Sequence, residues 1–266
     1  MRRIGIIGFG AIGRSLAAGL AAVPDVEIGG ILVRERSAER IRDAVPDGIR
    51  IVTDIRDLLE LAPHLIVECA GHEALQCFGA PILAVGTDLL VASVGALADP
   101  DLESELREAT LFGGRLLIPS GARGGLDALG AARAAGLDSV AYVGRKAPSA
   151  WRGTRAETLI DLDAMTAPQV FFESDARQAA LEFPKNANVV AAVALAGVGF
   201  EATRVQLVVD PAAVGNQHEI QARGAFGDIF TRVVAKTLPD NPRTSMLAPY
   251  SLVHSVRKTV DSIVIW

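Results

Sequence analysis

The chain has 266 residues, half of them apolar, with a formal net charge of −5 and an isoelectric point near 5.4. This length and apolar content allow one large or two medium domains with a sizeable core. No block of Lys and Arg forms a basic patch, so nucleic acid is not an expected partner. No run of eighteen uninterrupted apolar residues occurs, so we expect no membrane-spanning helix.

The two cysteines, Cys69 and Cys77, form no CxxC motif and no Cys/His metal spacing. We therefore expect neither a disulfide scaffold nor a bound metal. Glycines at 8, 10 and 13 interrupt the first apolar run, which is not typical of a signal peptide. These features predict a cytoplasmic protein.

Short apolar runs alternate with helical segments over the first 118 residues. The expected strands are 3–7, 26–33, 49–52, 65–69, 89–93 and 116–118. The expected helices are 11–22, one from a cap at Ser37 to about residue 44, one ending at 61, one between the fourth and fifth strands, and one opening at Asp99-Pro100. This alternation predicts an α/β fold, an N-terminal Rossmann domain with a doubly wound parallel sheet.

The pattern changes after Ser120. Expected elements are a helix at 124–135, strands at 139–145 and 169–173, two helical segments between 175 and 200, and strands at 204–209, 218–223 and 226–234. Gly224 and Ala225 separate the last two strands, which is a hairpin signal. We predict a second α+β domain with a mixed or antiparallel sheet.

Helical spacing continues from 243 to 263 in the C-terminal tail. The predicted organisation is a dinucleotide-binding domain at 1–119, with the tail 238–266 packing back on it. Residues 120–237 form the substrate, catalytic and oligomerisation domain. The open face of the second sheet needs cover, which predicts a homodimer.

A GxGxxG motif at residues 8–13 ends the first strand and opens a helix. Gly8 makes the tight turn, Gly10 lets the backbone approach a pyrophosphate, and Gly13 lets the helix pack closely on the strand. The amides at Ala11 and Ile12 belong to a helix N-terminus that attracts phosphate. The strand–turn–helix context favours a bound dinucleotide over an empty glycine-rich turn.

The second strand lacks the acidic residue that holds a ribose 2′-hydroxyl in NAD-binding sites. Val33 or Arg34 occupies that position, and Glu35 comes one residue late. Arg34 can instead meet a 2′-phosphate, so both NAD and NADP are expected cofactors. The alternative is that Arg34 is a solvated surface residue.

Small residues follow the fourth strand, where ligands bind in parallel sheets. Ala70 and Gly71 are expected to let the coenzyme pass close to the backbone. Ala122, in the glycine-rich loop at 120–125, is expected to line the same cleft. Asn188 precedes the most apolar helix and is a candidate for the nicotinamide end, with helix capping as the alternative.

His218 begins a strand in which His218, Ile220 and Ala222 share one face and charged residues share the other. The imidazole should therefore point to the apolar side. A histidine with limited water access suits acid–base catalysis. A buried, hydrogen-bonded structural histidine is the alternative.

Several longer motifs together resemble the L-aspartate dehydrogenase family of NAD(P)-dependent amino acid dehydrogenases. The stretches that carry the resemblance cover nearly the full chain: GFGAIG at 8–13, ECAGH at 68–72, SVGAL at 93–97, SGARGGLDAL at 120–129, GRKAPSAW at 144–151, PKNANVVAAVALAG at 184–197, NQHEIQARGAFG at 216–227 and NPRTS at 241–245.

This resemblance implies oxidation of L-aspartate with NAD(P)⁺ to iminoaspartate, which hydrolyses to oxaloacetate and ammonia or feeds NAD biosynthesis. It implies that His218 is the acid–base residue and that Ala122 and Asn188 contact the coenzyme. A dicarboxylate needs cationic partners, for which Lys185 is the first candidate and Thr244 and Ser245 are weaker hydroxyl candidates.

Three alternatives remain at this stage. A dihydrodipicolinate reductase or a homoserine dehydrogenase uses the same plan, and a non-catalytic dinucleotide sensor would report redox state to a partner. A sensor would not need His218 on a buried strand face.

Overall fold

The structure is a computed structural model that describes residues 1–122, 124–184, 186–238 and 241–265, with the backbone alone at 241–244. The chain forms two compact units. The first comprises Met1–Ala96, Pro100–Gly121 and Ala248–Trp266, and the second comprises Leu97–Asp99 and Ala122–Leu247. The first unit is therefore built from both ends of the chain.

The first unit contains a parallel six-stranded sheet in the order β3-β2-β1-β4-β5-β6. Its strands are β1 (Arg2–Ile7), β2 (Val26–Leu32), β3 (Arg50–Val52), β4 (Leu65–Glu68), β5 (Asp88–Val91) and β6 (Leu116–Leu117). This order is that of a doubly wound sheet, which confirms the predicted Rossmann domain. The strand order reverses between β1 and β4, where such sheets bind their ligands.

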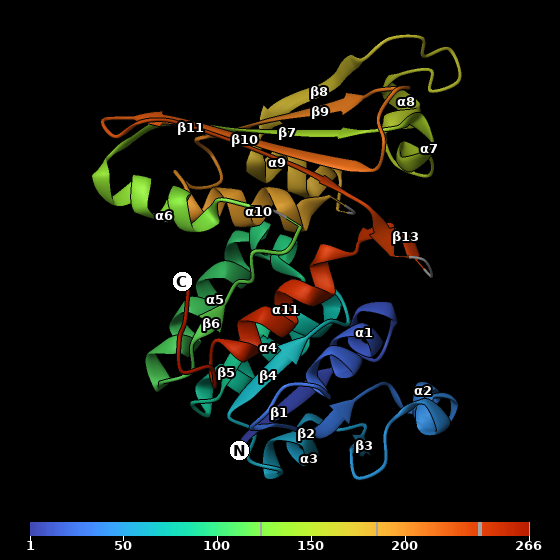
Figure 1. The fold of residues 1–266 in the computed structure, drawn as a ribbon, viewed down its shortest axis with the longest axis vertical. Helices are drawn as coiled ribbons and strands as arrows, with labels where there is room; N and C mark the ends of the chain where they lie inside the picture. Colours follow the sequence, from blue (N-terminus) through green and yellow to red (C-terminus); the bar gives the residue numbers. More distant parts are fainter. Residues whose placement is uncertain (123, 185, 239–240, 266) are drawn as a thin grey trace. The chain divides into compact units, whose positions relative to one another are not determined.

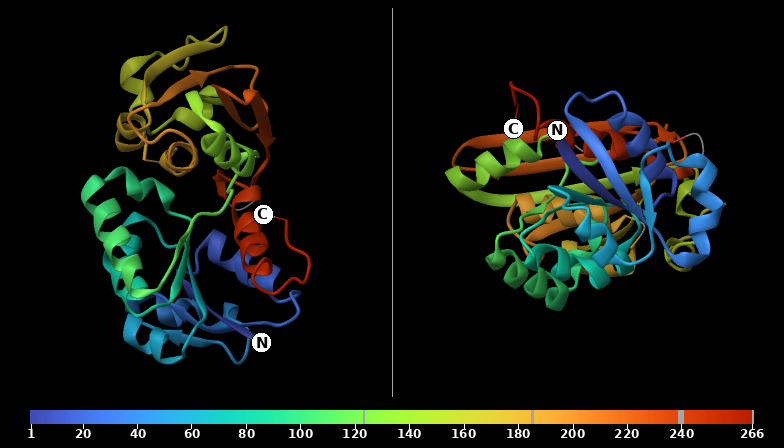
Figure 2. Two further views of the ribbon diagram at one scale, coloured as in Figure 1. Left: turned by 90° about the vertical axis from the view of Figure 1, so that its left-hand side faces the viewer. Right: turned by 90° about the horizontal axis from the view of Figure 1, so that it is seen from below.

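Helices cover both faces of this sheet, as the left view of Figure 2 shows. The helices are α1 (Ala11–Leu20), α2 (Glu35–Ile41), α3 (Ile55–Glu60), α4 (His72–Ala84), α5 (Pro100–Ala109) and α11 (Leu247–Arg257). Ile4 and Ile6 of β1 share one core with Leu16 of α1 and Leu252 of α11. Gly5 points to the opposite face, where an added Cβ would lie 3.3 Å from Leu58 of α3.

The second unit contains a mixed five-stranded sheet in the order β11-β10-β7-β9-β8. Its strands are β7 (Leu137–Lys146), β8 (Gln169–Asp175), β9 (Thr203–Val209), β10 (Asn216–Gly224) and β11 (Gly227–Ala235). Only the β7–β9 pair of this sheet is parallel. The predicted second α+β domain with a mixed sheet is confirmed.

Helices α6 (Leu126–Ala135), α9 (Ala176–Glu182) and α10 (Ala187–Ala196) lie on one face of this sheet (Figure 1). Short helices α7 (Pro148–Trp151) and α8 (Ala156–Leu159) follow β7. Because side chains alternate along a strand, β7 sends Val140, Tyr142, Gly144 and Lys146 to a single face. Val140 lies 3.1 Å from the position of a Cβ at Gly197, directly after α10, so this face is the helix-covered one.

Three predicted local features differ from the structure. Helix α2 begins at Glu35 with Arg34 at its N-cap, so Ser37 lies inside the helix and does not cap it. The hairpin turn is Ala225-Phe226, since Gly224 still pairs with Gly227. Residues 243–245 are a strand: β13 (Asn241–Ser245) pairs antiparallel with β12 (Thr237–Leu238).

This last pairing moves the boundary between the units. Residues 238–247 belong to the second unit, and the tail that returns to the first unit starts at Ala248. The first unit extends to Gly121, and the chain enters the second unit at Ala122. Among the described helices, none has both the length and the hydropathy that crossing a bilayer requires.

Candidate active site

The glycine motif forms a turn between β1 and α1. Gly8 has a φ of +91°, and an added Cβ there would lie 2.8 Å from the Cβ of Ala70. An added Cβ at Gly13 would lie 2.3 Å from the carbonyl oxygen of Gly8. Both positions therefore require glycine, one for its backbone conformation and contact and the other for close packing.

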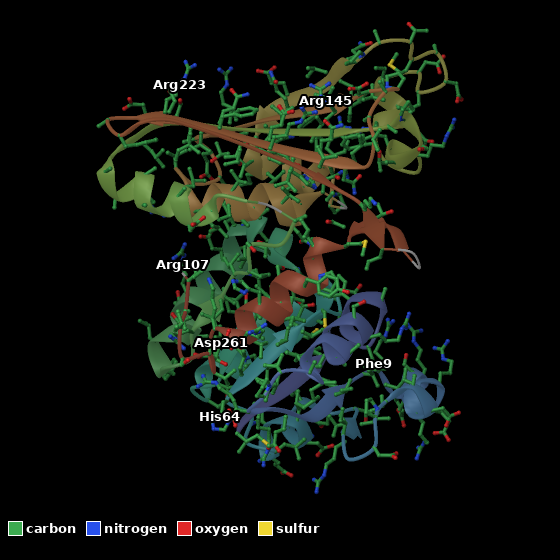
Figure 3. The ribbon with its side chains drawn as sticks, in the orientation of Figure 1. Phe9, His64, Arg107, Arg145, Arg223 and Asp261 are labelled. Atoms are coloured by element: carbon green, nitrogen blue, oxygen red, sulfur yellow. The ribbon has the colours of Figure 1, made fainter. Side chains whose placement is uncertain are left out.

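Gly10 differs from these two glycines, because an added Cβ would meet no atom within 4 Å. It is the N-cap of α1 and supplies no side-chain hydrogen bond to the helix. Helix geometry leaves the first amides, including those of Ala11 and Ile12, without intrahelical acceptors. Figure 3 labels Phe9, which lies between these glycines. The turn is thus open at Gly10 and offers amide donors, which fits a pyrophosphate.

A buried carboxylate joins the loops that follow β4 and β5. Glu68 Oε1 accepts hydrogen bonds from the amides of Ala70 at 2.7 Å and Gly71 at 2.8 Å, and from Ser93 Oγ at 3.0 Å. Glu68 Oε2 accepts from the amide of Ser93 at 3.0 Å. Gly71 has a φ of +118° and open space where a Cβ would be. One side chain therefore shapes both loops at the carboxyl edge of the sheet.

Glu68 is completely buried. Burial raises the pKa of this carboxyl, and the four hydrogen bonds, which favour the charged form, oppose that rise. The sequence analysis did not select Glu68 as a site residue. The available signal was an acidic residue at the end of an otherwise apolar strand, directly before two small residues.

Arg34 is exposed and is the N-cap residue of α2, shortly after β2 ends at Leu32. Glu35 is the first residue of that helix, outside the strand. The exposed guanidinium is thus available at the strand end where doubly wound folds hold the ribose of a dinucleotide.

In the second unit, His218 lies on β10 and is 5% exposed. Its neighbours on the same face, Ile220 and Ala222, are also buried, which confirms the predicted orientation of the strand. Arg223 extends from the opposite side of the sheet (Figure 3). The imidazole Nδ1 is 2.8 Å from the hydroxyl of Tyr142 on β7, and the two rings stack.

This hydrogen bond brings together residues 76 positions apart in the sequence. It depends on the register of β10 against β7, in which His218 faces Gly144. Gly144 leaves room beside the histidine for the phenol: a Cβ there would lie 2.9 Å from the Tyr142 hydroxyl. The sequence analysis missed Tyr142, because its strand neighbour cannot be known before the register is known.

A second polar cluster lies on the same face of β7. The ammonium of Lys146 donates to Oδ1 of Asn186 and lies 5.1 Å from the ring centre of Trp151. Lys146 and Asn186 are both buried. Burial lowers the pKa of Lys146 to about 8. The sequence analysis missed Lys146 as well, although the lysine ends a strand in the stretch GRKAPSAW.

The other predicted site residues differ in burial and in position. Ala122 is buried at the start of the second unit. Asn188 is exposed in the first turn of α10, and Asn186 holds the N-cap position without a capping hydrogen bond. Ser245 is buried, and its hydroxyl accepts from the amide of Leu247. Lys185 and the side chain of Thr244 lie outside the described part of the chain.

A surface hollow of about 510 Å³ is lined by Arg152 and residues 157–163. None of the candidate residues that the structure describes lines it.

The chain matches two protein families in succession. Residues 8–118 match the family described as "Homoserine dehydrogenase, NAD binding domain". Residues 127–259 match the family described as "Aspartate dehydrogenase, C-terminal". The first match agrees with the glycine turn, and the second spans both Tyr142 and His218.

Several L-aspartate dehydrogenases resemble the chain over almost its entire length. An L-aspartate dehydrogenase of Cupriavidus necator is 44% identical over 267 residues, which cover 99% of each chain. An L-aspartate dehydrogenase of Ruegeria pomeroyi is 45% identical, covering 96% of this chain and 92% of that one. The solved aspartate dehydrogenase of Thermotoga maritima is 25% identical, covers both chains completely and has a TM-score of 0.79.

Full-length similarity of this degree exceeds what a shared Rossmann domain alone produces. A hyperthermophilic archaeal homoserine dehydrogenase, at 12% identity and a TM-score of 0.60, shares the fold only. The first unit is an NAD-binding domain, and the chain belongs to the aspartate dehydrogenase family of NAD(P)-dependent oxidoreductases.

Proposed function

We propose that this chain oxidises L-aspartate with NAD⁺ or NADP⁺, giving iminoaspartate, which hydrolyses to oxaloacetate and ammonia. The observation that carries this proposal is the buried His218, hydrogen-bonded to Tyr142 within a domain of the aspartate dehydrogenase type. A module that only senses dinucleotides would have no use for such a pair. The product would serve NAD biosynthesis or aspartate metabolism.

The first unit binds the coenzyme in this proposal. The amides of Gly10, Ala11 and Ile12 hold the pyrophosphate at the N-terminus of α1, and Gly8 and Gly13 maintain the turn. Ala70 and Gly71 border the coenzyme at the loop that Glu68 shapes. Arg34 meets the 2′-phosphate of NADP. When bound, the coenzyme accepts a hydride from the α-carbon of the amino acid.

The second unit supplies the proton transfers and the substrate contacts. A phenol can both donate and accept a hydrogen bond, so Tyr142 can accommodate a proton on either nitrogen of His218. His218 can then take a proton from the substrate ammonium and later activate the water that hydrolyses the imine. Ala122 and Asn188 are proposed coenzyme contacts, and Lys185, Thr244 and Ser245 are proposed substrate contacts.

We also propose a cytoplasmic homodimer. Cys69 and Cys77 are both free thiols, which suits a reducing compartment. On β11, Phe230 and Val234 are 64% and 54% exposed. Their partners on β10 are Gln221 and Gln217, on the face opposite His218. A second copy of the chain would cover these side chains.

Reduced coenzyme formation tests the proposed function. The purified chain is supplied with L-aspartate, L-homoserine or L-glutamate, together with NAD⁺ or NADP⁺, and absorbance of the reduced nicotinamide is followed. L-Aspartate should be oxidised far faster than the other two amino acids. Preferred oxidation of L-homoserine would assign the chain to the alternative dehydrogenase, and coenzyme binding without turnover of any amino acid would favour a sensor.

A further inference from the structure

We propose that the ammonium of Lys146 binds a carboxylate of the amino acid substrate. This inference rests on the proposed function, since it names the group that selects an acidic substrate. Four features of the second unit support it: the position of Lys146, the state of its charge, the way its side chain is held, and the nearby end of α10.

Lys146 lies on the same sheet face as the proposed acid–base pair. Tyr142, Gly144 and Lys146 alternate along β7, and Gly144 pairs with His218 on β10. Strand geometry places the Cα atoms of Lys146 and His218 about 7 Å apart along the strands and about 5 Å apart across them. A four-carbon dicarboxylate can contact both side chains over such a separation.

The charge of Lys146 has no counter-charge among the described residues. Its burial is the cause that lowers its pKa, and no carboxylate offsets this effect. Asp210 follows the neighbouring strand, but its carboxylate pairs with Arg145 at 3.1 Å and accepts from the amide of Ala212. A buried ammonium is costly unless it is paired. An incoming carboxylate would supply the missing negative charge.

The lysine side chain is held in place by rigid neighbours. Trp151 is completely buried, and its indole nitrogen donates to the carbonyl of Val208. Phe171 and Phe183 pack against Trp151 edge to face. Among the described residues the ammonium also contacts Asn186, an uncharged acceptor that takes one of its three protons. The lysine is thus oriented without being neutralised.

The end of α10 adds a second attraction for an anion. Asn186 is the N-cap of this ten-residue helix, but its side chain contacts Lys146 and makes no cap hydrogen bond. The first turn of α10 contains no acidic residue. The positive end of the helix dipole therefore adds to the charge of the lysine. A structural lysine would instead be expected to have an acidic partner.

The decisive experiment compares Lys146→Met with Lys236→Met, which removes an exposed lysine of the same unit. Measured quantities are the KM for L-aspartate, the inhibition constant of succinate, and the dissociation constant of NADPH. A charge-assisted hydrogen bond contributes enough that KM and the inhibition constant should rise about 10- to 100-fold in Lys146→Met. NADPH binding should stay within about 2-fold, and Lys236→Met should match the parent chain in all three.

Asn186→Asp provides a second test that keeps the lysine. An aspartate at this position would pair with the ammonium and compete with the substrate. It should therefore raise both the KM for L-aspartate and the melting temperature. Weaker succinate binding together with a higher melting temperature separates charge neutralisation from general damage to the fold.

The proposal is overturned if folded Lys146→Met binds succinate as tightly as the parent chain, or if Asn186→Asp leaves succinate binding unchanged. Succinate binding to the NADPH-loaded parent chain is also measured by its effect on the melting temperature, without turnover. If that binding is normal and depends on Lys146 but L-aspartate is not oxidised, the proposed function fails while the carboxylate site stands.

Discussion

At the residue scale, the hydrogen bond between His218 and Tyr142 gives the clearest prediction. His218→Ala removes the imidazole that would move the protons of the reaction. We expect kcat to fall about 10²- to 10⁴-fold, since that is the usual contribution of general acid–base catalysis. NADPH binding, measured by fluorescence, should not change, because His218 lies outside the NAD-binding domain. The control is His254→Ala, an exposed histidine on α11; equal activity in the two variants would remove His218 from the mechanism.

The depressed pKa of Lys146 predicts how stability depends on pH. Burial lowers this pKa from 10.5 to about 8 in the folded chain. Between these two values the unfolded chain binds the proton more fully than the folded chain, so stability rises with pH in this window. The full shift corresponds to about 3 kcal/mol.

Urea unfolding of the parent chain and Lys146→Met at several pH values isolates this contribution. The free energy of unfolding of the parent chain should increase relative to that of the variant as pH rises from about 8 toward 10. A difference that stays constant with pH would show that the lysine is not desolvated.

At the element scale, Glu68 joins the ends of β4 and β5 through four hydrogen bonds, all of them accepted. Glu68→Gln replaces one acceptor oxygen with an amide donor that faces other donors. We expect a loss of about 1–3 kcal/mol in stability for the unsatisfied groups, together with weaker NADPH binding. Thermal unfolding and a fluorescence titration measure both, with exposed Glu60→Gln as the control. Normal coenzyme affinity in Glu68→Gln would restrict this residue to a purely structural role.

The position of Arg34 between β2 and α2 predicts how its substitution changes the preference for NADPH over NADH. Arg34 is exposed at this junction, where the 2′-phosphate of NADP would lie. Arg34→Ala should weaken NADPH binding about 10-fold or more and leave NADH binding nearly unchanged, because only NADPH carries the phosphate. Arg36→Ala, an exposed arginine within α2, is the matched control. Equal losses for both coenzymes would contradict the assignment.

These elements also show how far the sequence could be interpreted. Alternation along one strand correctly predicted that His218 is buried beside Ile220 and Ala222. The glycine motif correctly predicted a turn and a helix, because its constraints are local. The contacts of Tyr142, Lys146 and Asn186 depend on strand register and on helix packing, which no local sequence pattern encodes. Helical spacing at 243–245 was misleading because pairing with Thr237 overrides local propensity.

At the scale of the whole molecule, the first unit is built from both ends of the chain and the second mostly from its middle. The first unit closes only when α11, from the end of the chain, reaches the core formed by β1 and α1. The second unit is continuous except for Leu97–Asp99. The family match from 127 to 259 likewise spans most of the second unit together with α11. Sequence periodicity could predict that a tail helix returns, but only tertiary pairing shows where the return begins.

This discontinuity predicts that a substitution near the C-terminus destabilises the coenzyme domain. Leu252 of α11 is 1% exposed in the core that contains Ile4 and Leu16. Leu252→Ala should therefore lower the free energy of unfolding by about 2–5 kcal/mol. Leu247→Ala, at a position 44% exposed at the start of the same helix, should change it by less than about 0.5 kcal/mol.

Coenzyme binding identifies the unit that is affected. NADPH binds the folded first unit. At 100 times its dissociation constant, NADPH should therefore raise the free energy of unfolding of Leu252→Ala by about 2.7 kcal/mol. Thermal unfolding with and without NADPH measures this recovery, and the parent chain should gain the same amount. If Leu252→Ala unfolds like the parent chain, α11 contributes nothing to the core. If NADPH leaves the unfolding of the variant unchanged, the weakened unit is not the one that holds the coenzyme.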